Sequence, residues 1–404
     1  MKKMLLLFIC FSAVFMTSCW DATELNDVGL VIATGFDLDD DGFDRVTVLS
    51  IQPSGNVKEQ GGASTTWIGT ASGESAFEAL RNLRSISTRK LSWMHNKMVV
   101  IGKKKAESDI GNIIDLLLRY REMRYDNTIF VTEGTIEELF QVPPALDMSL
   151  TRELLGIISV ISEWSKGYAL SIKDIGVESI SEHMQGYVIG NIGFYETERL
   201  PVSEKREEYL KMYWKDSPQP IVYIRGAGVI DNNKLVGWLS PEELRGYLII
   251  SNKISSGVLE TVNVTEKGID VAVEILHLKS KISFPKVSLD NVTAEVSVEA
   301  KCRIQEVKGA APEHSMTFIE LVEEKIENSI ATEIYMALES SQNRLLCDFT
   351  GFHKEFSAKH KKEWEKLQGN WCINFSRMPI TCKVNVDIQN EGLLSRTFKV
   401  EGYR

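Results

Sequence analysis

The first half of the chain alternates short apolar runs with amphipathic segments. Between Glu107 and Tyr120, apolar residues recur at i, i+3, i+4, i+7 and i+8, which predicts an amphipathic helix. The mostly apolar segment Ser149–Trp164 predicts another helix. Four runs rich in branched residues predict strands: Val28–Phe36, Phe43–Ile51, Lys97–Gly102 and Asn127–Thr132. Mixed elements of this kind favour helices packed in layers on a sheet.

The second half combines alternating segments with one long helical pattern. In Val292–Ile304 and Ile380–Gln389, apolar and polar residues alternate, which predicts half-buried strands. From Met316 to Leu346, apolar residues recur at every fourth position and glutamates occupy the other face. A strict spacing of four drifts slowly around a helix, so we expect this helix to lie obliquely across a sheet. A further helix is expected at Phe352–Leu367.

Turn and capping signals stand at residues 231–243. Asp231-Asn232-Asn233 lies between two strand-like runs and predicts a hairpin turn. Ser240-Pro241-Glu242-Glu243 predicts a helix start, with Ser as N-cap, Pro at the first helical position and Glu at the third. Capping therefore explains the carboxylate pair without a catalytic role.

Together these patterns predict an α+β fold with mixed, antiparallel-rich sheets and packed helices in two or three domains. Charged residues crowd at Glu204–Glu208, and Pro218 and Pro220 follow, so we place a linker at 201–220. The predicted domains are an N-terminal α/β domain at 19–200, whose subdivision stays open, and a C-terminal α+β domain at 221–404. The long helix near 316–346 belongs to the second.

Residues 1–18 have the pattern of a secretory signal peptide. Lys2 and Lys3 precede the apolar run Met4–Met16, and Thr17-Ser18 then leads to Cys19. The alternative is a transmembrane anchor. Thirteen helical residues reach only about 20 Å, whereas a bilayer core needs about 30 Å. Length therefore favours the cleaved leader.

Cys19 is the candidate lipidation site. Met16-Thr17-Ser18-Cys19 resembles the lipobox of bacterial lipoproteins, although Met16 stands where leucine is usual. Several acyl chains on one cysteine make membrane attachment effectively permanent. Removing residues 1–18 deletes two lysines, which leaves 44 basic against 56 acidic residues, a formal charge of −12. An acidic body argues against nucleic acid as a partner.

Four cysteines remain beyond the anchor: Cys302, Cys347, Cys372 and Cys382. Cys302 and Cys382 fall on the apolar faces of predicted strands, where they fit as small buried hydrophobes. A Cys302–Cys382 disulfide stays open, because sequence does not determine strand pairing. The cysteines show no CxxC or clustered Cys/His spacing, so no metal is expected.

No enzyme signature stands out, and no catalytic, metal or cofactor residue is assigned. HExxH, GxSxG, Walker and GxGxxG patterns are absent from the sequence. His353 and His360 are seven apart on one predicted helix, among Lys359, Lys361 and Lys362. We interpret this segment as a solvated basic face. The acidic run Asp37–Asp41 is interpreted as a solvated hairpin turn, since it lacks the frame of a calcium loop.

Several short motifs resemble the Ger(x)C family of spore germination lipoproteins. The proposed mature end, Cys19-Trp20-Asp21-Ala22-Thr23-Glu24-Leu25, is similar to the start of that family. Further similarities cover nearly the whole mature chain: His95–Gly102, Gly111, Leu116–Arg119, Arg124, Gly228, Asp231–Leu239, Glu243–Gly246 and Asp348–Phe352. The order of these motifs and the lipobox are together more specific than any one of them.

The resemblance implies a subunit of a nutrient germinant receptor. Such a subunit would be anchored to the outer face of the spore inner membrane and would pair with A-type and B-type membrane subunits. It would act as a non-catalytic receptor or scaffold component in spore germination. The alternative function is a solute-binding lipoprotein that captures a small nutrient directly.

Overall fold

The computed structural model describes residues 27–51, 66–145, 147, 149–180, 186–195, 220–261, 264, 268–288, 291–309 and 316–390. The predicted signal peptide 1–18 and Cys19 lie outside these residues, as does nearly all of the predicted linker 201–220.

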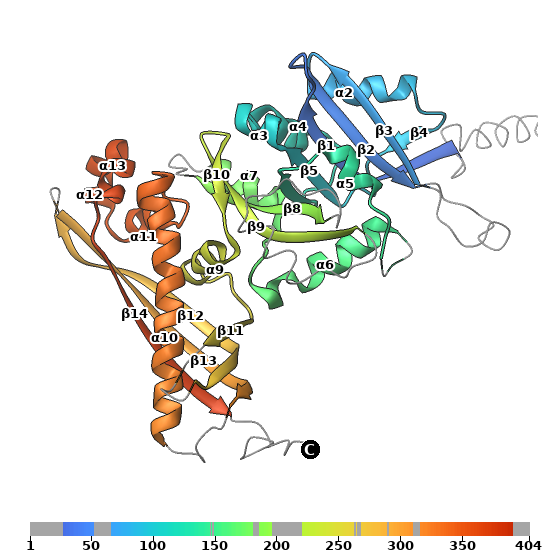
Figure 1. The fold of residues 1–404 in the computed structure, drawn as a ribbon. Coiled ribbons are helices and arrows are strands. Elements are labelled where there is room, and N and C mark those ends of the chain that lie inside the picture. Colours follow the sequence, from blue (N-terminus) through green and yellow to red (C-terminus); the bar gives the residue numbers. More distant parts are fainter. Residues whose placement is uncertain are drawn as a thin grey trace, which may run out of the picture.

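The N-terminal part is built on a mixed sheet (Figure 1). Among the described residues its main path runs β10-β9-β8-β6-β5-β1-β2-β3, while β4 pairs with β1 and β7 with β6. Its strands are β1 (Val28–Leu38), β2 (Asp44–Ile51), β3 (Thr66–Gly73), β4 (Lys90–Ser92), β5 (Met98–Gly102), β6 (Thr128–Thr132), β7 (Leu170–Ser171), β8 (Tyr187–Tyr195), β9 (Ile221–Asp231) and β10 (Lys234–Leu239). Its helices are α2 (Ala76–Asn82), α3 (Lys103–Ser108), α4 (Gly111–Arg119), α5 (Ile136–Gln141), α6 (Leu150–Trp164) and α7 (Ile172–Ile180).

Both faces of this sheet are covered, and each face has its own core. Along β5, Val99 and Ile101 join the core beneath α2, α4 and α7. Met98 and Val100 point the other way and join the core beneath α5 and α6. Successive side chains of a strand point to opposite faces, so a strand buried on both faces is apolar throughout. This explains why β5 appears in the sequence as a continuous apolar run.

The β9–β10 hairpin belongs to the large sheet although it follows the predicted linker. β9 pairs antiparallel with β8, from Tyr187 opposite Ile230 to Tyr195 opposite Ile221. At the hairpin tip, Asn232 and Asn233 have φ values of 48° and 62°. The Asn233 carbonyl accepts a hydrogen bond from the Ile110 amide at 2.9 Å. The placement of the domain boundary within 201–220 stays a prediction.

The C-terminal part packs a long helix on a smaller sheet (Figure 1). Among the described residues the strand order is β11-β12-β13-β14, antiparallel except for the parallel pair β13–β14. The strands are β11 (Gly257–Thr261), β12 (Asp270–Ser288), β13 (Asn291–Lys308) and β14 (Ile380–Asn390). The helices are α9 (Pro241–Ile250), α10 (Met316–Glu339), α11 (Phe352–Lys359), α12 (Lys361–Leu367) and α13 (Trp371–Ser376), with a π turn at Ser340–Arg344.

The fourfold stripe of α10 forms the core of this part. Val322, Ile326, Ile330 and Ile334 are fully buried, in one cluster with the inward residues of β12 and β13. Figure 1 shows α10 crossing the strands obliquely, as the stripe predicts. The α+β fold class with mixed, antiparallel-rich sheets is thereby confirmed.

Helices α9 and α10 approach each other closely at Gly246. A Cβ at this position would lie 2.0 Å from the Glu333 carbonyl oxygen, so only glycine fits. Next to it, the buried Arg245 guanidinium pairs with the buried Glu333 carboxylate, with Nε 2.6 Å from Oε2. The helix start is confirmed as well, because Ser240 and Glu243 form a reciprocal capping box.

The four cysteines described are free thiols. Cys302 faces Ile388 across the parallel pair β13–β14, whereas Cys382 faces Val296. The two cysteines are therefore offset by six residues, about 20 Å along the strands. A disulfide needs Cα atoms within about 7 Å, so this structure has no Cys302–Cys382 bridge.

Two predicted helices are interrupted. The segment 107–120 changes direction at Asp109, where the extended backbone separates α3 from α4. The segment 352–367 is divided at His360, whose φ of −130° and ψ of 57° are not helical. Predicting one continuous helix was wrong in both places, because apolar spacing does not report a local break of the backbone.

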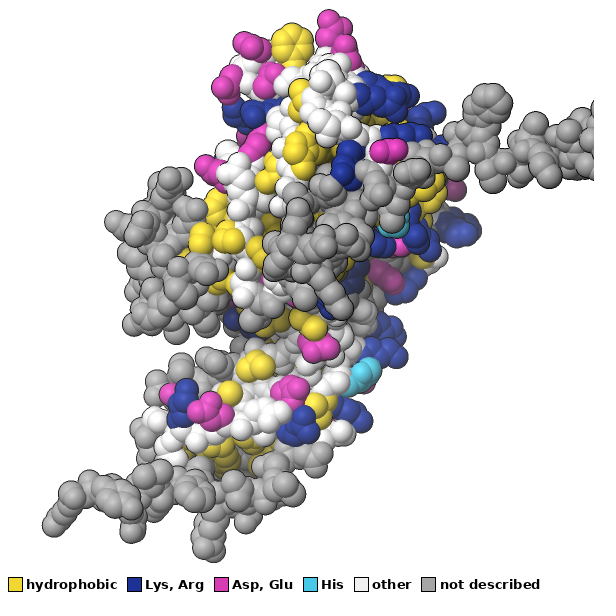
Figure 2. Space-filling view, turned by 90° about the vertical axis from the view of Figure 1, so that its right-hand side faces the viewer, with side chains coloured by type: hydrophobic (Ala, Val, Ile, Leu, Met, Phe, Trp, Pro, Cys, Tyr) yellow, Lys and Arg dark blue, Asp and Glu magenta, His cyan; other side chains and the backbone are white. Residues whose placement is uncertain are grey.

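The surface carries both signs of charge. On the face in Figure 2, acidic and basic side chains of the described residues are interspersed, and hydrophobic side chains form small groups. In the predicted acidic turn, Asp40 and Asp41 are exposed, but Asp37 is half-buried near the end of β1, so the prediction of a solvated turn was wrong for Asp37. Asp39 Oδ1 accepts hydrogen bonds from the amides of Asp41 and Phe43. A hydrogen bond from Ser72 and these amides holds the pKa of Asp39 below its usual value.

Candidate functional site

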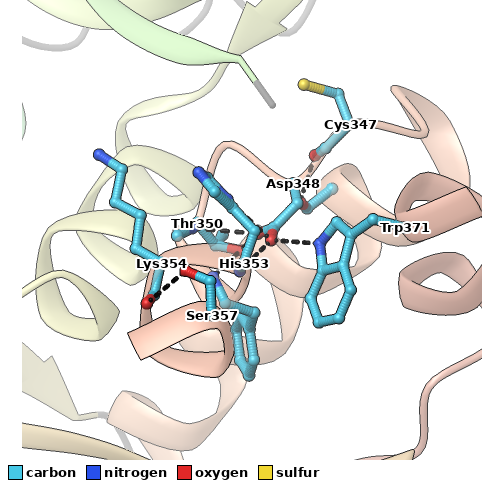
Figure 3. A network of polar contacts seen from close by, with 10 residues as sticks. Cys347, Asp348, Thr350, His353, Lys354, Ser357 and Trp371 are labelled. Atoms are coloured by element: carbon cyan, nitrogen blue, oxygen red, sulfur yellow. Dashed lines mark hydrogen bonds and ion pairs between the residues drawn. The ribbon is translucent and has the colours of Figure 1, made fainter. Parts of the chain in front are cut away.

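A buried carboxylate organises the segment between α10 and α11. Asp348 is fully buried, and Figure 3 shows it at the centre of a polar network. Its oxygens accept hydrogen bonds from Thr350 Oγ1, from the amides of residues 351–353 and from Trp371 Nε1 at 2.8 Å. Several donors to one carboxylate compensate for its removal from water. Asp348 thereby fixes the first turn of α11 and the position of α13.

His353 belongs to this buried network. Its ring is 3% exposed, and Nδ1 lies 3.1 Å from Asp348 Oδ2. His360 is only half-buried, and its ring packs against Phe284 and Phe356. Interpreting this segment as a solvated basic face was therefore wrong for His353. Lysine neighbours in the sequence do not show whether a histidine side chain points to solvent or into the core.

A cavity of about 280 Å³ lies beside this network. Its walls come from the end of α9 and the following turn, from the middle of β12, and from the segment between Phe349 and Glu355. These segments are up to about a hundred residues apart in sequence and meet only in the folded chain. The cavity is the candidate ligand site of the described residues.

At one wall of the cavity, the Asn252 side chain makes the two hydrogen bonds to β12 that a neighbouring strand would make. Asn252 Nδ2 donates to the Ser280 carbonyl at 2.7 Å, and Asn252 Oδ1 accepts from the Ser280 amide at 2.6 Å. Both bonds are of the type that a neighbouring strand would supply to β12, and the β11 pairing ends at Ile275. Asn252 has a φ of 54°, a left-handed conformation that asparagine tolerates better than most residues.

The next residue, Lys253, is held by two phenols. Its Nζ donates to Tyr168 Oη at 2.8 Å and to Tyr247 Oη at 2.9 Å, and it also lies over both rings. Burial raises the pKa of Tyr168, so this phenol stays neutral. The ammonium of Lys253 therefore meets a neutral phenol at Tyr168.

The structure offers no metal centre in its described part, where no group of three or more His, Cys, Asp or Glu side chains is placed to hold an ion. The described helices likewise include none long and apolar enough to cross a membrane. Cys19, the one site residue predicted from the sequence, lies outside the described residues.

Two family models match the chain in tandem. A spore germination protein N-terminal domain matches residues 21–189, and a spore germination B3/GerAC-like C-terminal domain matches residues 225–392. The chain belongs to the Ger(x)C family of spore germination proteins. The resemblance predicted from the short motifs is thereby confirmed.

Relatives of this Ger(x)C protein extend over its whole length. It is 23% identical to spore germination protein KC of Bacillus subtilis (strain 168), over 98% of each chain. It is 20% identical to spore germination protein B3 of the same organism, over 96% of this chain and 97% of the relative. The crystal structure of the GerBC protein has a similar fold, with a TM-score of 0.52 and 19% identity over 89% of this chain and 98% of that one.

The family-like motifs of this Ger(x)C protein lie at packing junctions. Asn96 is buried and accepts from Thr34 Oγ1 at 2.9 Å. A Cβ at Gly111 would lie 2.9 Å from Asn233 Nδ2. Glu243 accepts from Arg344 Nη2, which ties α9 to the π turn that follows α10. The motifs therefore specify how the elements join, and only Asp348–Phe352 borders the cavity.

Sequence reasoning missed the residues of the cavity, above all Lys253, Ser280 and Lys354. They show no common spacing or motif. The only signal near them was the family-like segment Asp348–Phe352, which pointed to this region without indicating its chemistry.

Proposed function

We propose that this Ger(x)C protein is the lipid-anchored subunit of a spore nutrient germinant receptor. Cys19 would carry the lipid, and the body would stand on the outer face of the spore inner membrane. Membership of the family along both matched domains supports the role in spore germination. The single observation that supports the anchor is the lipobox-like sequence ending at Cys19.

The position of Cys19 would keep the body near the bilayer. Eight residues, Trp20–Asp27, separate Cys19 from the first strand at Val28. Fully extended, eight residues span at most about 30 Å. The large sheet would therefore lie within reach of partner subunits in the same membrane.

The role we propose is non-catalytic. The partners would be the A-type and B-type membrane subunits, and the chain would serve as a receptor or scaffold component beside them. Charges of both signs on the face in Figure 2 support attachment through lipid and protein contacts rather than through a broad cationic surface.

A cysteine replacement tests the anchor. Cys19→Ala should abolish labelling by radioactive palmitate and shift the protein from the membrane fraction to the soluble fraction. Cys372→Ala is the matched control, because Cys372 is an exposed thiol elsewhere in the chain, and this variant should label normally. Continued fatty-acid labelling of Cys19→Ala would refute the assignment.

Crosslinking in isolated spore inner membranes tests the partners. A photoreactive residue on the exposed turn at Asp40 should crosslink to a membrane subunit of the receptor in the lipidated protein and not in Cys19→Ala. Crosslinking that is equal in both proteins would show that the contact is independent of the anchor. The absence of crosslinks from Asp40 and from exposed residues of α6 and α10 would count against the scaffold role.

A further inference from the structure

We propose that the outer edge of β3 docks an extended segment of a partner protein. This segment is uncharged where it pairs with β3 and carries a basic residue beside the turn between β1 and β2. The proposal rests on the proposed function in one respect, because it assigns the segment to another subunit of the same receptor. It is based on the hydrogen-bonding groups along the edge, on the lack of charge in β3 and on the acidic residues at its end.

Four strands end the two sheets, and side chains cover three of these edges among the described residues. Arg344 donates to the Trp238 carbonyl of β10 at 3.0 Å, and a bulge interrupts the pairing of β10 with β9. Arg245 donates to the Val258 carbonyl of β11 at 2.9 Å. Side chains of α10 accept hydrogen bonds from three amides of β14. Covering an edge in these ways prevents other strands from pairing with it.

β3 lacks most of these features. Its eight residues include no charged side chain and no proline, and its pairing with β2 shows no register shift. Among the described residues, one side chain covers its outer edge: Asn82 Nδ2, at the end of α2, donates to the Ser72 carbonyl at 2.9 Å. β3 is the outermost strand at its end of the large sheet (Figure 1). Most of this strand is therefore open to pairing along one edge.

The backbone groups that face outward follow from this one contact. In an antiparallel pair, successive residues direct their amides and carbonyls to opposite edges of the strand. The Ser72 carbonyl meets Asn82 outside the sheet, so Thr70 and Ile68 also direct their backbone groups outward. Within the described part of the chain, neither residue has a backbone partner on that side. Alternating donors and acceptors of this kind bind an added strand.

The two faces of β3 are closed by its own side chains. A Cβ at Gly69 would lie 2.1 Å from the Trp67 ring, so this indole covers the backbone of Gly69 on one face. On the other face, Ile68 packs against the core beneath α5 and α6. An uncharged partner segment would extend these faces without placing an unpaired charge beside them. This is why we expect the paired part of the segment to lack charge.

The Ser72 end of β3 is acidic. Asp39, in the turn between β1 and β2, takes a hydrogen bond from Ser72, and a Cβ at Gly73 would meet the Glu78 side chain. Four acidic residues of this region form no ion pair with the described residues: Asp39, Asp41, Glu74 and Glu78. Uncompensated charge of one sign attracts a partner of the opposite sign and orients it. A lysine or arginine of the partner segment would meet these carboxylates.

The test uses the full lipid-modified protein in isolated spore inner membranes. A photoreactive benzoylphenylalanine replaces Thr66, the exposed first residue of β3, and mass spectrometry identifies the crosslinked peptides. We expect a segment of a membrane subunit with an uncharged stretch of strand length and a basic residue at one end. The control places the same residue at Asn385, exposed on β14. That probe should not crosslink to this segment.

Two variants of Thr70 test the edge itself. Thr70→Pro and Thr70→Ala both remove the hydroxyl contact with Thr47, but only proline removes the outward amide. Thr70→Pro should lower the crosslinking yield about tenfold, the effect of one lost hydrogen bond, while Thr70→Ala keeps the yield. The melting temperatures of both variants should be similar, because proline is tolerated where an edge amide faces solvent.

Glu74→Lys tests the acidic end without altering the strand. Glu74 is exposed, so the variant should fold normally and crosslink several-fold less from Thr66. Glu324→Lys makes the same charge change on an exposed position of α10 and should crosslink like the wild-type protein. Equal yields from the two variants would refute the role of the acidic end.

Other results would overturn the docking edge. Crosslinks from Thr66 to a second copy of this chain would assign the edge to self-association. A yield no higher than from Asn385, or equal losses in the two Thr70 variants, would show that no strand pairs there. The receptor role is tested separately, through lipid labelling of Cys19 and crosslinking from Asp40. Success of those two tests with failure at Thr66 would reject this inference alone.

Discussion

Glu327 Oε1 accepts a hydrogen bond from the Val386 amide at 3.0 Å, so a helix side chain occupies the outer edge of β14. One turn earlier on α10, Glu323 Oε1 accepts from the Ile388 amide, also at 3.0 Å. β14 is the last strand of its sheet among the described residues. An uncovered strand edge presents free amides that recruit other strands, and these two glutamates cover part of this one.

Replacing both glutamates should destabilise the folded protein and uncover the outer edge of β14. Glu323→Ala/Glu327→Ala leaves two amides without partners, which should cost about 2–4 kcal/mol of unfolding free energy. Urea denaturation measures this loss, and light scattering should show more self-association. Glu324→Ala, exposed on the same helix, is the control and should change neither. Equal stability of the double variant would show that water replaces the carboxylates.

Gly246→Ala should separate α9 from α10. The added methyl group would meet the Glu333 carbonyl, and overpacking of this kind costs about 1–3 kcal/mol or more. Gly156→Ala makes the same change inside α6, where the methyl group meets nothing within 4 Å. That variant should gain up to about 1 kcal/mol from helix propensity. Thermal unfolding of both proteins checks the opposite signs.

Removing one partner of the buried pair Arg245–Glu333 should lower the free energy of unfolding more than removing both. Arg245→Met leaves the Glu333 carboxylate buried without its partner and should cost about 3–5 kcal/mol. Arg245→Met/Glu333→Leu removes both charges and should recover most of that loss. Denaturant unfolding of the two variants tests this order of stability. A double variant as unstable as the single one would show that the guanidinium's bond to the Val258 carbonyl is the important contact.

The thiols should differ strongly in reactivity. Burial raises the pKa of Cys302 to about 12 and that of Cys382 to about 11, which suppresses the thiolate at neutral pH. Cys347 is buried as well, whereas Cys372 is exposed. Iodoacetamide should therefore modify Cys372 first, and all four thiols after unfolding without reductant. Mass spectrometry that finds only two reactive thiols after unfolding would reveal a disulfide.

Asp37 should make stability depend on pH. Burial raises its pKa, against the lowering effect of hydrogen bonds from the Leu38 and Lys105 amides. The folded state then holds this proton more tightly than the unfolded state. The contribution of Asp37 is greatest below the ordinary aspartate pKa and is lost as the pH rises through the raised value.

Asp37→Asn isolates this effect. The stability of the wild-type protein relative to this variant should fall as the pH rises from about 4 to 7. Asp41→Asn, which removes an exposed carboxylate from the turn after β1, is the matched control. Chemical denaturation at several pH values measures both differences. A difference that grows with pH would mean that the amide hydrogen bonds outweigh burial.

The patterns that proved reliable are those that depend on one element alone. The alternation at Val292–Ile304 predicted β13, and the fourfold stripe from Met316 predicted α10. A strand that depends on pairing with its neighbour was missed. β3 (Thr66–Gly73) is rich in Gly and Thr and has no clean alternation, and its pairing with β2 is what makes it a strand. The break at His360 was missed as well, and there the ring packs against Phe284 and Phe356.

The candidate site was less predictable than the fold. Asp348 attracted notice only as part of a family-like motif, because no local pattern shows that a carboxylate will be buried. Ser280 and Lys354 come together only when β12 and α11 pack. A site assembled from distant segments has no spacing that sequence reasoning could detect.

The β9–β10 hairpin has a mechanical consequence. The Asn233 carbonyl at its tip accepts a hydrogen bond from the Ile110 amide just before α4, and Arg344 in the π turn after α10 donates to the Trp238 carbonyl at 3.0 Å. These two hydrogen bonds tie the hairpin of the large sheet both to α4 and to the segment that follows α10. We expect a tilt of one part of the chain to be passed to the other through this hairpin.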